Sequence, residues 1–187
     1  MNREEFLALA QAAFENPEEA DFVVLRQAYV ESDIYEPTAH YSYHKLMGQT
    51  NSATSFEEVA QMCEHLLEAN PMDLEVRMLL DYVYSQLEQH DLAAMHHAFV
   101  EGMLRAIFNS GDGRSIGSAW EVVAVAEEYT LLSVMGLRLQ RQALVEEDGV
   151  FYDVLSVMPR TSDNEADILE LYFDITAPFN YLRNNLL

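Results

Sequence analysis

Cysteine, lysine and tryptophan each occur only once in this chain of 187 residues, as Cys63, Lys45 and Trp120. A single cysteine cannot form an internal disulfide, so the sequence does not indicate an oxidising compartment. No stretch approaches the roughly 18 uninterrupted apolar residues that a membrane-spanning helix needs. The opening residues MNREEFLALAQAAF contain only a short, interrupted apolar run, which is not typical of a signal peptide or a membrane anchor. We therefore expect a cytoplasmic protein.

Basic side chains are also few. The chain has 10 lysine and arginine residues against 32 aspartate and glutamate residues, so its formal net charge is -22. Proteins bind nucleic acids and anionic lipids largely through lysine and arginine. We therefore expect neither nucleic acid nor a membrane as a partner, whereas a protein or peptide with a basic surface suits this charge. Hydrophobic residues make up 50% of the chain, which is enough for a folded core.

The apolar residues of the first third of the chain recur at helical spacing. The pattern predicts a helix from Arg3 to Phe14. A second helix is predicted to begin at Asn16-Pro17, an N-cap residue followed by proline, and to continue to Tyr29. The residues from 31 to 53 predict a loop with a short helix around 40–47.

Three longer helices follow and are joined by short turns, which makes them antiparallel neighbours: 55–69, 73–88 and 91–108. Ser55 and Glu58 predict a capping box, and Asp73 predicts the next N-cap. The spacing resembles tetratricopeptide repeats, because SFEEVAQMCEHLLEANP is similar to the second helix of a repeat with its closing proline. Fewer than two repeats are recognisable. We therefore expect a repeat-like hairpin within a larger helical part, residues 1–109.

From Ser110 onward the pattern changes from helical spacing to the alternation that is typical of half-buried strands. A short helix is expected at 127–135, and Glu147-Asp148-Gly149 predicts a hairpin turn. Four strands are predicted, at 120–126, 137–145, 151–157 and 169–175. The expected fold is α+β: tetratricopeptide-like N-terminal helices packed against a C-terminal, mostly antiparallel four-stranded sheet with one short helix, residues 110–187, in one integrated domain.

The order of short motifs after Ser110 resembles a bacterial family known as a domain of unknown function. The motifs are SGDGxS, AWxV, EEYxxLxxxGL, QxLVxxDGxxYDVxxV and LYFDI. The resemblance covers residues 21–182 and is most specific over 110–157. It implies the fold, with a tetratricopeptide-like front, and it implies no particular activity.

Gly113, Ser115 and Gly117 match the G-x-S-x-G pattern of hydrolase nucleophiles. That motif needs a strand before the serine, a helix after it and a histidine later in the chain. Here a helix precedes the serine, a strand follows it, and no histidine occurs after His97. The sequence therefore does not predict hydrolase catalysis, and it shows no other complete set of catalytic residues.

The glycine-rich loop 110–115 is the best candidate for a ligand site, because successive backbone amides and Arg114 can bind an anion. A plain turn between a helix and a strand is the alternative. The candidate ligand-binding residues are Asp112, Arg114, Ser115, Trp120, Glu127 and Tyr129. Adjacent Glu127 and Glu128 point about 100° apart on a helix, so they favour stabilisation of the helix start over joint acid–base chemistry.

The histidines and the cysteine favour structural roles. His96 lies on an apolar stripe and is predicted to be a hydrogen-bonded core residue, and Cys63 is predicted to be core as well. His97 and Glu101 are four residues apart and are suited to hold a metal, but no third ligand has suitable spacing. We therefore predict neither a cofactor nor a metal site.

Two functions are open on the sequence alone. The repeat-like helices favour a protein-interaction module, in which exposed Tyr82 and Tyr84 and nearby acidic residues contact a basic or extended partner. The alternative is a small-ligand-binding protein or an enzyme with a cleft between helices and sheet near residues 110–129. We predict the interaction module, and the sequence favours a role without catalysis.

Overall fold

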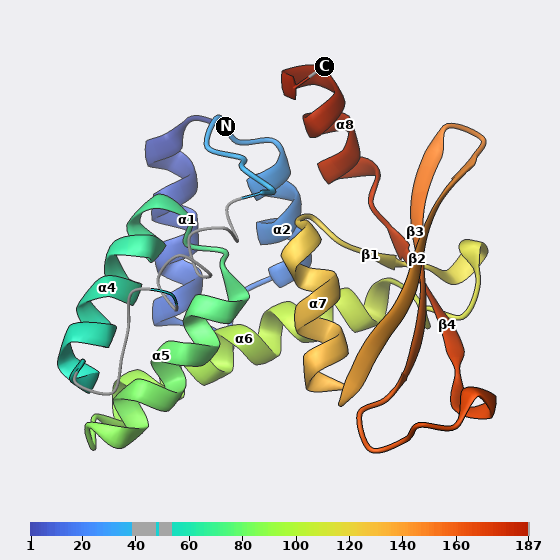
Figure 1. Ribbon diagram of the computed structural model, residues 1–187. Helices are drawn as coiled ribbons and strands as arrows, with labels where there is room; N and C mark the ends of the chain where they lie inside the picture. The colour runs from blue at the N-terminus through green and yellow to red at the C-terminus, as the bar shows by residue number, and fades with distance from the viewer. Residues whose placement is uncertain (39–47, 49–53, 187) are drawn as a thin grey trace. The chain divides into compact units, whose positions relative to one another are not determined.

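Helices fill the first half of the chain and a four-stranded, mostly antiparallel sheet with further helices follows, which confirms the predicted α+β class (Figure 1). This computed structural model describes residues 1–38, 48 and 54–186. The chain forms two units, Met1–Leu104, which is helical, and Arg105–Leu187, which contains the sheet. The predicted short helix around 40–47 lies outside the described residues. The likeness of the helices to tetratricopeptide repeats stays a prediction.

The helical unit contains five helices within its described residues: α1 (Arg3–Glu15), α2 (Phe22–Val30), α4 (Phe56–Ala69), α5 (Leu74–Gln86) and most of α6 (His90–Ser110). Side-chain caps fix two helix starts as predicted, because Ser55 and Glu58 form a capping box and Asp73 accepts an amide of α5. The predicted start of the second helix at Pro17 is wrong. The Asp21 side chain instead accepts hydrogen bonds from the amides of Val23 and Val24, so α2 begins at Phe22. None of the described helices is long and apolar enough to cross a membrane.

Two groups of buried side chains hold the helical unit together. Helices α4, α5 and α6 share a cluster of buried residues: Ala60, Cys63, Val76, Leu80, Val83, Tyr84 and Ala93. The rings of α1, α2 and α6 form the second group, in which Phe6 packs on Tyr29 and Phe22 lies edge-on to Phe99. Gly102 permits this close packing, since a Cβ at that position would lie 2.1 Å from an atom of the Phe22 ring.

The second unit is built on a sheet with the strand order β1-β4-β3-β2. Its strands are β1 (Trp120–Glu121), β2 (Leu137–Glu147), β3 (Val150–Pro159) and β4 (Leu169–Asp174). Strands β2, β3 and β4 are antiparallel neighbours and β1 pairs with β4 in parallel, so the sheet is mostly antiparallel as predicted. Asp148 and Gly149 have positive φ angles of 51° and 81°, as a type I′ hairpin turn requires, which confirms the predicted turn.

Three features of this unit differ from the prediction. The run 120–126 is a strand only at its first two residues, because α7 (Val125–Val134) begins inside it. Strand β2 is one of the two edge strands of the sheet and is mostly exposed, with a bulge between Leu139 and Arg141 that interrupts the expected alternation. The helix α8 (Thr176–Leu186) after the last strand is absent from the prediction.

Candidate binding pocket in the helical unit

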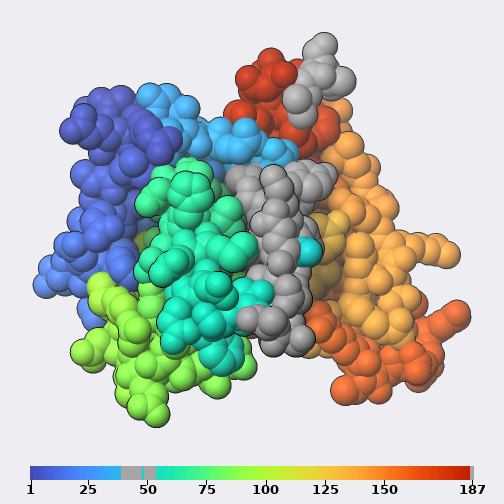
Figure 2. Space-filling model, turned by 60° about the vertical axis from the view of Figure 1, so that its left-hand side comes forward, coloured from blue at the N-terminus to red at the C-terminus, as the bar shows by residue number. Residues whose placement is uncertain are grey.

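A pocket of about 570 Å³ lies within the helical unit, between α1, the end of α4, α5 and the first half of α6. Helices α1 and α4 lie side by side on the surface of this unit (Figure 2). The apolar wall includes Leu7, Ala10, Phe14, Leu67 and Leu92, and the polar groups include Arg3, Glu64, Arg77, Tyr84 and His96. Small-molecule sites in proteins commonly enclose about 300–1,000 Å³, with mostly apolar walls and a few convergent polar groups. This pocket fits that description.

Arg77 places a positive charge in the wall of the pocket. The residue is 4% exposed, and its guanidinium carbon lies 3.7 Å from the ring centroid of Phe99 and 4.9 Å from that of Phe14. Among the described residues, only its Nε has a hydrogen-bond partner, the carbonyl of Pro71 at 2.8 Å. Burial lowers the pKa of Arg77 to about 9, although the charge of Asp73 opposes this shift. The group is therefore charged at neutral pH, and its terminal nitrogens have unused donors.

His96 brings a second unsatisfied group into the same wall. The residue is 5% exposed, and its ring stacks on Tyr84 with the centroids 5.7 Å apart. Its Nδ1 has no hydrogen-bond partner in the described part of the chain, so His96 lies in the core as predicted but lacks the predicted hydrogen bond at this atom. Burial and the charge of Arg77 lower the pKa of His96 to about 3. The imidazole is therefore neutral at physiological pH and can donate or accept at Nδ1, depending on its tautomer.

Tyr84 closes one side of the pocket, and its hydroxyl donates a hydrogen bond to the Glu64 carboxylate. The expectation that Tyr84 is exposed is wrong, because Tyr84 lies one helical turn after the buried Leu80 and is itself 5% exposed. Tyr82, in contrast, is 55% exposed and lies outside the pocket. The partner-binding role of both tyrosines stays a prediction.

Cys63, His97 and Glu101, which the sequence analysis weighed for chemistry, do not line the pocket. Cys63 is buried in the adjacent core, as predicted, and burial raises the pKa of its thiol to about 12, which keeps it protonated at neutral pH. His97 is exposed and pairs with Asp81 at 3.0 Å and with Glu101 at 3.6 Å. Over residues 1–38, 48 and 54–186, no three His, Cys, Asp or Glu side chains are arranged to hold a metal ion.

The glycine-rich loop of the second unit uses its polar groups internally. The amides of Asp112 and Gly113 both donate to the Ser118 carbonyl, at 3.0 and 2.8 Å. The Asp112 carboxylate accepts the Ser118 hydroxyl and the Arg114 amide, and these hydrogen bonds lower the pKa of Asp112. The Ser115 hydroxyl lies 2.9 Å from that of Ser118. Because three of the amides already have partners, the geometry favours a turn over the predicted anion site.

The other three predicted ligand-binding residues also have partners within this unit. Trp120 is buried, and its Nε1 donates to a backbone carbonyl of the loop. Glu127 is buried, and its carboxylate accepts the Val123 amide at 2.8 Å, which is the helix-start role that the sequence favours. Tyr129 is 40% exposed and donates to the Gln142 side chain. These three side chains line neither the helical pocket nor a second, open hollow that lies beside the glycine-rich loop. Their ligand role stays a prediction.

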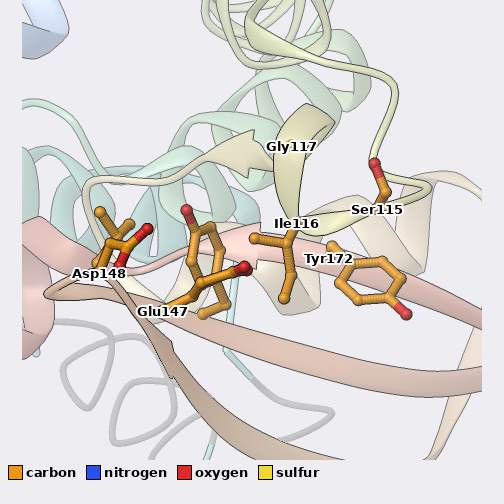
Figure 3. A pocket seen from close by; sticks show the side chains of 8 residues that line it. Ser115, Ile116, Gly117, Glu147, Asp148 and Tyr172 are labelled. Atoms are coloured by element: carbon orange, nitrogen blue, oxygen red, sulfur yellow. The ribbon is translucent and has the colours of Figure 1, made fainter.

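That open hollow of about 680 Å³ lies beside the glycine-rich loop (Figure 3). Residues 115–117 form one side of it, and the β2–β3 hairpin with Tyr172 of β4 forms the other. Its charged side chains are the carboxylates of Glu147 and Asp148, which disfavour an anion and favour a cation. Of the six predicted ligand-binding residues, only Ser115 lines this hollow.

Two arrangements that the sequence does not reveal are the Arg77–His96 wall and a buried pair of carboxyl groups in the second unit. Glu128 is fully buried, and neither of its carboxyl oxygens has a hydrogen-bond partner among the described residues. Asp153 is 5% exposed and accepts a hydrogen bond from Gln142 at 2.7 Å. Burial and then the charge of Asp153 raise the pKa of Glu128 well above its ordinary value, and burial raises that of Asp153 too.

Fold and pocket together define an α+β protein with a ligand-sized cavity in its helical part. A family model described as "Domain of unknown function (DUF4919)" matches residues 18–183, which is most of the chain, so the protein belongs to this family. This membership confirms the resemblance to a domain-of-unknown-function family, while the signature motifs and the repeat-like front stay predictions. No curated protein and no solved structure gives a significant match to the chain.

Proposed function

We propose that this protein is a binding protein whose helical unit takes up a small organic ligand. The observation that carries the proposal is the pocket between α1, α4, α5 and α6, where buried Arg77 and His96 have unused hydrogen-bonding atoms. A ligand that accepts hydrogen bonds from the terminal nitrogens of Arg77 would use donors that no other described group uses. The apolar wall around them supports a ligand with an apolar body.

A fragment screen by ligand-observed NMR on the full chain tests this proposal. Leu92 lines the pocket and is 36% exposed, so Leu92→Trp should fill the cavity with little cost to the core. Val24 on α2 is 54% exposed and does not line the pocket, so Val24→Trp is the matched control. We expect fragments that bind the wild type and the control equally and bind Leu92→Trp at least about tenfold more weakly, a loss of about 1.4 kcal/mol. The absence of any such fragment would contradict the proposal.

A second candidate is the protein-interaction module that the sequence predicts. Three exposed apolar side chains on α4 and α5 support it: Phe56, Met78 and Tyr82 are 40%, 37% and 55% exposed, and the Phe56 ring lies edge-on to that of Tyr82. The acidic chain favours a basic partner. A pull-down at low and at high salt tests this role. A basic protein that binds the wild type at low salt, but binds neither Tyr82→Ala at low salt nor the wild type at high salt, would support it. Equal retention by both proteins would contradict this role.

A further inference from the structure

The buried positive charge of Arg77 in the helical pocket has no carboxylate partner among the described residues. Arg77 is buried in the wall, and none of the carboxylates that the structure describes forms an ion pair with it. Asp73, whose charge acts on Arg77, accepts the Val76 amide at the start of α5. Glu64, at the edge of the cavity, accepts the Tyr84 hydroxyl. The pocket therefore contains a buried cation whose terminal N–H groups have no acceptor among the residues that the structure describes.

We propose that Arg77 and His96 form a carboxylate-binding subsite, and that the ligand of this protein is a small organic acid with an apolar body. This inference rests on the proposed function and names the chemical class of its ligand. A planar guanidinium matches a carboxylate through two parallel N–H···O hydrogen bonds. The His96 ring also lines the pocket, and it adds a third donor when a ring nitrogen that faces the ligand carries the proton.

A single buried cation favours a monoanion over a phosphate group. Phosphate carries close to two negative charges and usually binds where several arginines, lysines or helix amides converge. Here the neighbouring imidazole is neutral, and Arg3 at the rim donates to the Glu68 carbonyl at 3.0 Å. The exposed carboxylates of Glu64 and Glu68 also line the pocket and repel a dianion more strongly than a monoanion.

The apolar part of the ligand is specified by the side chains around the subsite. Phe14 lies 4.7 Å from the His96 ring and 4.9 Å from the Arg77 guanidinium, measured from its ring centroid, so an apolar surface begins directly beside the charged group. Leu7 and Leu92 continue this surface from α1 and α6. A phenyl or short branched alkyl group next to the carboxylate fits such a wall.

The test compares two probes of the same shape, 3-phenylpropionate and 3-phenylpropanamide, which differ in the charge at one end. Their affinities for the full chain are measured by ligand-observed NMR at neutral pH. We expect the acid to bind at least about tenfold more tightly than the amide, because a charge-assisted bidentate hydrogen bond is stronger than a neutral one. The acid, and not the amide, should also shift the ring-nitrogen signals of His96. Phenyl phosphate is the third probe, and tighter binding of phenyl phosphate than of the acid would overturn the carboxylate assignment.

Two substitutions locate the effect at the guanidinium. Arg77→Met keeps an unbranched side chain and removes the charge, so it should abolish the advantage of the acid and leave the affinity of the amide nearly unchanged. Arg77→Lys keeps the charge without the planar fork and should retain only part of the advantage. Circular dichroism checks that each variant is folded. The comparison of acid and amide on the wild type stands even if both variants unfold.

The outcomes separate this inference from the proposed function. If the acid and the amide bind equally and Leu92→Trp weakens both, the pocket binds ligands but the carboxylate subsite is wrong. If neither probe binds, the subsite is also wrong, and the fragment screen decides the proposed function by itself. An acid that binds more tightly, with an advantage that depends on Arg77, supports both.

Discussion

Glu128→Gln should stabilise the sheet-containing unit relative to the wild type, and this difference in stability should grow as the pH rises. Glutamine has nearly the same shape as a protonated glutamic acid and stays uncharged at every pH. Burial raises the pKa of Glu128 well above 4.5, so the folded protein keeps a proton that the unfolded chain loses. For a raised pKa, the contribution to stability is complete below the unfolded value and is lost as the pH rises towards the folded value.

The size of this effect follows from the linkage between proton binding and folding. In the pH window between those two pKa values, each pH unit lowers the unfolding free energy of the wild type by about 1.4 kcal/mol relative to Glu128→Gln. The two proteins should therefore differ little below about pH 4.5 and diverge as the pH rises above it. Glu128 and Asp153 act on each other's pKa, so the difference between the two proteins reports the titration of this buried pair.

Urea unfolding at a series of pH values measures this difference. Trp120, the only tryptophan of the chain, is buried in the same unit, so its fluorescence reports the unfolding of that unit. The matched control is Glu127→Gln, which weakens the hydrogen bond to the Val123 amide and should lower stability by about 0.5–1 kcal/mol. In the control, any gain that grows with pH should be smaller than in Glu128→Gln, because the charge of Glu127 raises the pKa of Glu128 less than burial does. Parallel stability profiles for the wild type and Glu128→Gln would refute the reasoning.

Three further substitutions test the packing and the turns. Gly102→Ala should destabilise the helical unit by about 1–3 kcal/mol in thermal unfolding followed by far-ultraviolet circular dichroism, because the new Cβ would lie 2.1 Å from an atom of the Phe22 ring; an unchanged melting temperature would contradict this packing. Ser55→Ala should lower stability by about 1 kcal/mol in the same assay, since it removes the cap of α4, and restoration by Ser55→Asp checks the cause. Gly149→Ala should lower the unfolding free energy by about 1–2 kcal/mol, measured by Trp120 fluorescence, because alanine is strained at a φ of 81°. No atom lies within 4 Å of the added Cβ, so backbone strain alone accounts for this loss.

Local sequence signals predict two of the helix starts and the hairpin correctly. The Ser55–Glu58 capping box and the Asp148–Gly149 turn depend on a few adjacent residues, and both form as expected. The apolar run at 120–126 was ambiguous because a short apolar stretch suits a buried strand or a buried helix equally. At the start of α7, the Glu127 carboxylate accepts a hydrogen bond from the Val123 amide, a contact that favours the helix.

The candidate site could not be predicted from the sequence, because each of its features depends on side chains from separate helices. Arg77 reads as an ordinary charged residue of α5, and it is buried only because Phe14 of α1 and Phe99 of α6 pack on its guanidinium. His96 was placed correctly in the core by its apolar stripe, but the missing partner of its Nδ1 appears only in three dimensions. The raised pKa of Glu128 likewise depends on its burial and then on the charge of Asp153, which lies on a later strand.

The most direct measurement of the central claim is a crystal structure of the full chain with 3-phenylpropionate. The account predicts the carboxylate of the ligand within roughly 3 Å of the terminal nitrogens of Arg77, with the phenyl ring against Phe14. A ligand bound elsewhere, or a protein carboxylate paired with Arg77 in its place, would contradict it.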